Sequence, residues 1–272
     1  MTNLNRLTCL FWGAAWVAAW TTEAAGQVKD PAPTLKTQLS FLLVGGASQP
    51  KDLFYLSAVG GQSIKVSVPV TAVSKTRPTA YDGPLSLSLF LPPPSAGGAA
   101  QASTPGKPLP PPLPVAKVSL PRGDQCLILL APGAAAGAGQ PAGYTAIALE
   151  DDWKTAPVGT LRFLNYSGKL LKAKFDKGQV ADLQKGPSTP VRIVEAGAPE
   201  LLFRFVLMTD SPAGGEVVYQ NELKLAGNQR FTIVLVPAGP RAPNGVLATV
   251  VREVSLARLA PGAKPGGGSP TR

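Results

Sequence analysis

The sequence predicts an all-β protein built as an antiparallel β-sandwich, and three observations lead to this fold class. Apolar residues occur in short runs separated by Gly, Pro, Asn and Asp, which are typical turn residues. Several runs alternate apolar and polar residues, as at 64–68 and 85–91, which is the pattern of a strand with one buried face. No long stretch keeps a 3.6-residue apolar period free of Gly or Pro, so the pattern does not favour helices.

The runs follow one another at intervals of about a dozen residues, the spacing of strands in sandwiches and barrels. A break near 150–158 divides them into two halves of about 110 residues, the usual size of an immunoglobulin-like domain. We therefore expect one half over 37–150 and a second over 151–257, with a single sandwich of some 220 residues as the alternative. The expected strands are 38–44, 53–59, 63–73, 85–91, 115–120, 126–131, 144–149, 161–166, 170–175, 191–194, 201–208, 216–225, 230–236 and 246–256.

Residues 1–25 have the composition of a secretory signal peptide. Arg6 precedes an uncharged, largely apolar run over 7–20, and small residues follow it. This run is shorter than the roughly 20 residues that a membrane-spanning helix needs. We expect cleavage near residue 25 and export to the periplasm or the extracellular space, with no transmembrane segment afterwards; an uncleaved anchor is the alternative.

The residue inventory narrows the chemistry that the chain can perform. It contains no histidine, which excludes Ser-His-Asp and Cys-His catalysis and every zinc site built on histidine. Once the signal peptide is removed, Cys126 is the one cysteine left, and an apolar run surrounds it. We expect no enzyme activity, no metal and no cofactor. A carboxylate-based glycan hydrolase stays open as an alternative, because residue counts do not exclude paired acids.

Segments rich in Pro and Gly are expected to form long loops. Residues 92–114 hold nine prolines and three glycines, and proline cannot donate to a strand ladder. This segment is expected as an extended, polyproline-like loop between two strands, with a docking peptide as the alternative. A second loop is expected over 132–143, a flexible lead over 26–36 and a flexible tail over 258–272.

Positive charge is concentrated in one segment of the chain. The whole sequence carries 26 Lys+Arg against 16 Asp+Glu, a net charge of +10, and residues 161–192 alone contribute +5. The runs 161–166 and 169–175 predict a hairpin with its turn near 165–168. In the second strand, Lys172 and Lys174 would share the face toward solvent.

This hairpin is a candidate binding site for an anionic polymer of the cell envelope, such as an acidic glycan, or for anionic lipid headgroups. Nucleic acid is not expected as a partner, because the chain is exported and no set of aromatic side chains interleaves the lysines. The alternative is a solvated strand face whose lysines hinder pairing with other sheet edges. The candidate residues are Arg162, Lys169, Lys172, Lys174 and Lys177.

Trp153 is a further candidate binding residue. It ends the acidic segment 150–153 and is the one tryptophan that remains after signal removal. An exposed indole would stack on a sugar ring, whereas the alternative packs Trp153 between the two halves. Calcium is not expected here, because adjacent side chains diverge while calcium needs six to eight converging oxygens.

The segment 161–178 reads Leu-Arg-Phe-Leu-Asn-Tyr-Ser-Gly at 161–168, and Lys-Ala-Lys-Phe at 172–175 and Gly178 follow. With these residues it resembles uncharacterised secreted bacterial β-sandwich modules of the immunoglobulin-like kind. In those modules a strand that ends in Asn-x-Ser turns into a second strand and then a glycine. The resemblance implies an immunoglobulin-like fold and brings no catalytic residue. We expect an exported structural or binding protein, with an accessory subunit that docks on another exported protein as the alternative.

Overall fold

The computed structural model confirms that the protein is all-β. It describes residues 34–45, 49–50, 52–59, 62–71, 74–92, 112–133, 143–176, 178–211, 215–239 and 245–255. Within these ranges the chain forms seventeen strands and no helix. The expected signal peptide, the centres of both long loops and the tail lie outside the described residues, as does Lys177.

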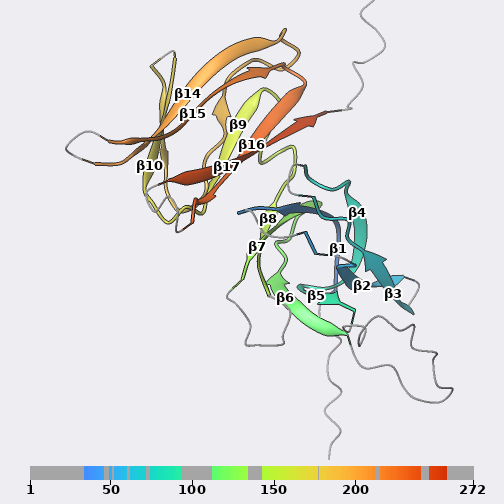
Figure 1. Ribbon diagram of the computed structural model, residues 1–272. Helices are drawn as coiled ribbons and strands as arrows, with labels where there is room; N and C mark the ends of the chain where they lie inside the picture. Colours follow the sequence, from blue (N-terminus) through green and yellow to red (C-terminus); the bar gives the residue numbers. More distant parts are fainter. Residues whose placement is uncertain are drawn as a thin grey trace, which may run out of the picture. The chain divides into compact units, whose positions relative to one another are not determined.

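The N-terminal half forms two four-stranded sheets (Figure 1). Sheet A has the order β4-β1-β7-β8, and sheet B has the order β3-β2-β5-β6. Buried side chains from both sheets, among them Phe41, Tyr55 and Ile128, form one apolar core. The strands are β1 (Thr34–Leu43), β2 (Phe54–Val59), β3 (Gln62–Ser67), β4 (Thr79–Pro84), β5 (Ser86–Leu91), β6 (Leu113–Ser119), β7 (Gln125–Pro132) and β8 (Tyr144–Glu150).

The C-terminal half repeats this arrangement (Figure 1). Sheet C has the order β12-β9-β16-β17, with β13 also paired to β9, and sheet D has the order β11-β10-β14-β15. Phe163, Phe205 and Ile233 belong to a second core, which draws on both of these sheets. The strands are β9 (Thr160–Asn165), β10 (Leu171–Phe175), β11 (Val180–Leu183), β12 (Gly186–Pro187), β13 (Val191–Arg192), β14 (Leu201–Thr209), β15 (Val217–Leu225), β16 (Gln229–Pro237) and β17 (Val246–Val254).

The two halves share one topology. In each, the first strand lies inside its sheet and runs parallel to the second-last strand, as β1 does to β7 and β9 to β16; the other pairs are antiparallel. The registers also match, because Leu39 and Phe41 pair with Cys126 and Ile128 as the corresponding residues of β9 and β16 pair with each other. The repeated Leu-x-Phe-Leu at 39–42 and 161–164 is the sequence trace of this repeat.

A third apolar cluster joins the two halves. It contains Leu42 and Leu129 from sheet A and Leu164 and Val234 from sheet C, none of them more than 1% exposed. Strands β1, β7, β9 and β16 therefore bury both faces over much of their length. Among the described residues, each sheet takes its strands from one half only.

The predicted hairpin of 161–175 is wrong. Strands β9 and β10 belong to different sheets, so the segment between them crosses from sheet C to sheet D. The Asn165 side chain holds this crossing, because its amide donates to the carbonyls of Lys169 and Leu183, each at 2.8 Å. Its oxygen accepts from Ser167, and Gly168 adopts a φ of +78°, a conformation that favours glycine. In this bend the buried Asn165 side chain has partners for both its amide and its oxygen.

Candidate functional site

Lys172 and Lys174 lie where their alternation in the sequence places them, on the outer face of β10. Leu171, Ala173 and Phe175 point into the core beneath, and Lys174 is exposed. Lys172 forms an ion pair with Asp210 at 2.7 Å, and this hydrogen-bonded contact raises the pKa of the ammonium group. Lys172 also lies directly opposite Asp182 on β11. Acidic side chains therefore lie beside the lysines and partly neutralise the positive charge of this face.

The outer face of sheet D combines charged and apolar side chains. The strand registers place Val180 beside Lys174, and Leu202 beside Lys224. Arg204 pairs with Glu222 at 3.1 Å across β14 and β15. We name this surface the sheet D outer face, made up of Lys172, Lys174, Val180, Asp182, Leu202, Arg204, Val206, Met208, Val217, Gln220, Glu222 and Lys224.

Arg162 does not lie with the lysines. It belongs to β9, it is 4% exposed, and its guanidinium points toward the junction between the halves. Its Nη2 donates to Asp151 Oδ1 at 2.6 Å and to Thr232 Oγ1 at 3.3 Å, and its Nη1 donates to the Glu150 carbonyl. Lys169 lies in the β9–β10 crossing, where its carbonyl accepts from Asn165.

Arg230, on β16, is the centre of a buried charge cluster. It is completely buried, and all three of its side-chain nitrogens donate hydrogen bonds. Nε donates to Glu253 at 3.0 Å, and Nη2 donates to Asp151 Oδ1 at 3.1 Å. Nη1 donates to the backbone carbonyls of Asp152 and Ala156. We call this set the buried charge cluster: Lys75, Asp151, Arg162, Arg230 and Glu253.

Lys75 connects the N-terminal half to this cluster. It lies between β3 and β4, and its ammonium group donates to Asp151 Oδ2 at 2.6 Å and to Glu253 Oε1. Burial raises the pKa of Asp151, but the charges of Lys75, Arg230 and Arg162 outweigh burial and hold this pKa below its ordinary value. Three cations thus enclose two carboxylates, and Arg162 Nε is buried with no partner among the described residues.

Trp153 packs against the same cluster. The guanidinium of Arg230 lies 4.0 Å from the centre of the indole ring, a cation–π contact. One ring face is therefore covered by Arg230, and Trp153 is half-buried. Of the six predicted site residues, the structure brings Arg162 and Trp153 together at the junction and leaves Lys172 and Lys174 on sheet D.

The sequence pattern did not identify Lys75, Arg230 and Glu253 as members of a charge cluster. Arg230 and Arg162 each lie within or beside apolar runs that belong to strands buried on both faces. A cation in such a run needs a buried acid, because an unpaired buried charge is too costly. The need for a buried acid could therefore have been predicted from the sequence, and the acidic segment 150–153 contains one such partner, Asp151.

Chemically, the described residues offer no cluster of three or more His, Cys, Asp or Glu side chains that would hold a metal. Cys126 is buried, and burial raises the pKa of its thiol although Thr37 contacts the sulfur at 3.5 Å. A protonated, buried thiol is a poor nucleophile.

In the part of the chain that the structure describes, no helix has the length and apolar character to cross a membrane. No protein-family model matches the chain, and no curated protein matches it in sequence.

Proposed function

We propose that the protein is an exported, non-enzymatic binding protein of the cell envelope, composed of two immunoglobulin-like β-sandwich modules. In this proposal the second module docks on another exported protein through the sheet D outer face. The repeated topology and the separate core of each half support the two-module description. The basic composition of the chain supports a partner with acidic groups.

The observation that carries this proposal is the exposed apolar content of the sheet D outer face. Val180, Leu202 and Val217 are each 52% exposed. Lys174 and Lys224 lie directly beside the first two in the strand registers. Apolar side chains interleaved with cations are typical of protein interfaces, where apolar contact supplies affinity and charge supplies orientation.

A carboxylate-based hydrolase has less support. Asp151 and Glu253 share two partners, Lys75 and Arg230, and so lie together. Their side chains are only 2% and 13% exposed, however, and each is engaged by cations. Acid and base catalysis on a glycan needs carboxyl groups that reach the substrate, and this pair lacks that access.

Binding of an anionic polymer remains the second candidate. Exposed Lys174 and Lys224 on the sheet D outer face favour it. Asp210, Asp182 and Glu222 weaken it, because each lies against a cation of the same sheet. A polymer held by exposed charges alone would be released by salt, as the screening length falls from about 10 Å at 0.1 M to about 3 Å at 1 M.

The test measures how much purified protein binds to envelopes of the native host at 0.1 M and at 1 M salt. Docking on a protein predicts binding that persists at 1 M salt and disappears when the envelopes are first treated with protease. The double variant Val180→Asp, Leu202→Asp should then lose binding. The matched control is Leu247→Asp on β17, since Leu247 is 44% exposed but lies on another sheet.

Two results would overturn docking on a protein. Release at 1 M salt together with loss of binding in Lys172→Glu, Lys174→Glu would instead support the anionic polymer. Equal binding by the Val180→Asp, Leu202→Asp variant and the wild type would show that the protein does not dock through the apolar residues of the sheet D outer face.

A further inference from the structure

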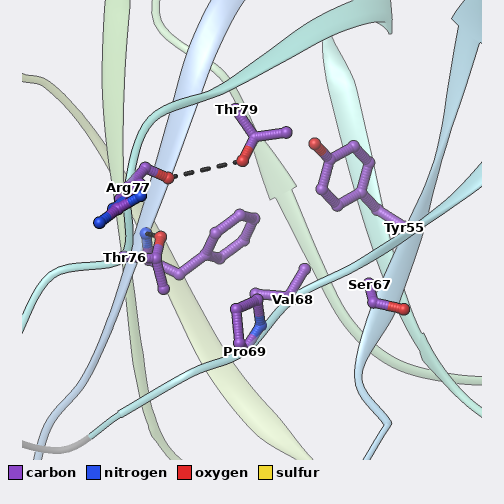
Figure 2. A pocket seen from close by; sticks show the side chains of 8 residues that line it. Tyr55, Ser67, Val68, Pro69, Thr76, Arg77 and Thr79 are labelled. Atoms are coloured by element: carbon purple, nitrogen blue, oxygen red, sulfur yellow. Dashed lines mark hydrogen bonds between the residues drawn. The ribbon is translucent and has the colours of Figure 1, made fainter.

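A pocket of about 190 Å³ opens into the N-terminal half beside the aromatic part of its core (Figure 2). Phe41 from β1 and Tyr55 from β2 line its inner part, and their rings stack with centres 6.0 Å apart. Val68 and Pro69, which follow β3, form an apolar wall. The other lining residues are Ser67, Thr76, Arg77 and Thr79.

The wall that carries Thr76 is fixed by hydrogen bonds. The Phe41 amide donates to Thr76 Oγ1, and the Thr76 amide donates to the Phe41 carbonyl, each at 2.9 Å. The Thr79 hydroxyl donates to the Arg77 carbonyl at 3.5 Å. These polar groups of the lining already have partners within the protein.

The Tyr55 hydroxyl is the exception. Tyr55 is 0% exposed, yet its hydroxyl has no hydrogen-bond partner among the described residues. Figure 2 shows this hydroxyl turned toward the side of the pocket where Thr79 lies. Burial raises the pKa of Tyr55 to about 12, so the group stays protonated near neutral pH and can donate a hydrogen bond. A buried donor without a partner is rare in folded proteins.

We propose that this pocket binds a small, uncharged aromatic molecule that carries one hydrogen-bond acceptor, such as a carbonyl oxygen. The acceptor accepts a hydrogen bond from the Tyr55 hydroxyl, and the ring packs between Phe41 and the Val68–Pro69 wall. The volume suits one substituted ring, since an apolar cavity of roughly 150 Å³ holds benzene. The buried part of the lining carries no charged side chain, because Arg77 is exposed at the rim. This site is independent of the sheet D outer face.

The experiment titrates the protein with acetophenone and, as a probe of similar size without the acceptor, with ethylbenzene. Binding is read from the methyl NMR signals of Val68 in methyl-labelled protein. Acetophenone should shift these signals saturably, and Tyr55→Phe should weaken its binding about fivefold, which is the value of one neutral hydrogen bond. The affinity for ethylbenzene should be equal in the wild type and in Tyr55→Phe.

A second measurement tests whether the hydroxyl is unpartnered before any ligand is added. Tyr55→Phe should leave the melting temperature unchanged or raise it, whereas Tyr81→Phe should lower it, because the Tyr81 hydroxyl donates to the Pro84 carbonyl at 2.8 Å. The proposal is overturned if neither probe shifts the Val68 signals, or if acetophenone binds both proteins equally. It is also overturned if Tyr55→Phe melts at a lower temperature than Tyr81→Phe.

Discussion

At the scale of single residues, Arg230 is the side chain on which the junction depends most. Its guanidinium contacts two carboxylates and several backbone carbonyls while being completely buried. A buried ion pair adds little net stability over an apolar replacement of both partners, since desolvation offsets attraction. Removing one partner is different, because it leaves the other charges buried and uncompensated.

We therefore expect Arg230→Met to lower the free energy of unfolding by about 3–5 kcal/mol. Asp151 and Glu253 would each lose a cation, and the Asp152 and Ala156 carbonyls would lose a donor. Denaturant unfolding measures this change. Lys224→Met, which removes an exposed cation of the same half, is the control and should change stability by less than about 0.5 kcal/mol. A loss below about 1 kcal/mol for Arg230→Met would contradict the cluster.

The lowered pKa of Asp151 predicts how stability depends on pH. Because the pKa is lower in the folded state, the carboxylate stabilises the fold above its ordinary value of 3.8, and this contribution disappears as pH falls through the folded-state pKa. The charges that face Asp151 are Lys75 from the N-terminal half, Arg162 on β9, Arg230 on β16 and Glu253 on β17.

The measurement compares the free energy of unfolding of the wild type and Asp151→Asn between pH 7 and pH 2. The wild type should be the more stable protein at pH 7, and the difference should shrink below about pH 4 as the carboxylate becomes protonated. A difference that stays constant across this range would show that the ionisation of Asp151 does not contribute to stability.

At the scale of elements, the crossing between β9 and β10 depends on Asn165. This side chain is 1% exposed and bonds to two backbone carbonyls and to Ser167. No aliphatic side chain can replace both its donors and its acceptor. The Asn-x-Ser sequence, read as a hairpin turn, instead encodes a bend that carries the chain from one sheet to the other.

We expect Asn165→Ala to lower the free energy of unfolding by about 2–4 kcal/mol, because it leaves the Lys169 and Leu183 carbonyls without a donor. The control is Asn228→Ala, a change at an exposed turn residue, which should stay within about 0.5 kcal/mol. Equal effects of the two substitutions in denaturant unfolding would mean that the crossing does not need its side-chain bonds.

The alternation of apolar and polar residues correctly predicted which side chains of a strand face solvent, but it did not predict which strands pair. The outward direction of Lys172 and Lys174 follows from period two, which acts within one strand. The partner of a strand depends on contacts far along the chain, so β9 was assigned to β10 although it pairs with β16, about 70 residues later. The short edge strands β4, β11 and β12 were missed, because few of their residues are buried and their apolar signal is weak.

The same limit applies to the candidate site, because the sequence pattern did not show which strands are buried on both faces. Charge counting placed Arg162 with the neighbouring lysines, but a charge count does not register that β9 is buried on both faces. The repeated Leu-x-Phe-Leu at 39–42 and 161–164 would have indicated that the halves share one topology. It would not have revealed the Tyr55 pocket, which depends on side chains from four separate segments.

At the scale of the whole molecule, the third apolar cluster couples the two halves. Eight buried side chains form it, all from sheets A and C except Val44, which directly follows β1: Leu42, Val44, Leu127, Leu129, Leu164, Val234, Val236 and Val251. Burial of each is worth about 1.5–3 kcal/mol, so exposing even half of them would cost as much as the whole stability of an ordinary domain, about 5–15 kcal/mol. Neither half should remain folded once the other unfolds.

The most direct test of this coupling is differential scanning calorimetry of the purified wild-type protein. If the shared apolar cluster and the buried charge cluster join the halves, heating gives one transition whose calorimetric enthalpy equals its van't Hoff enthalpy. Two separate transitions, one for each half, would contradict the coupling of the two halves.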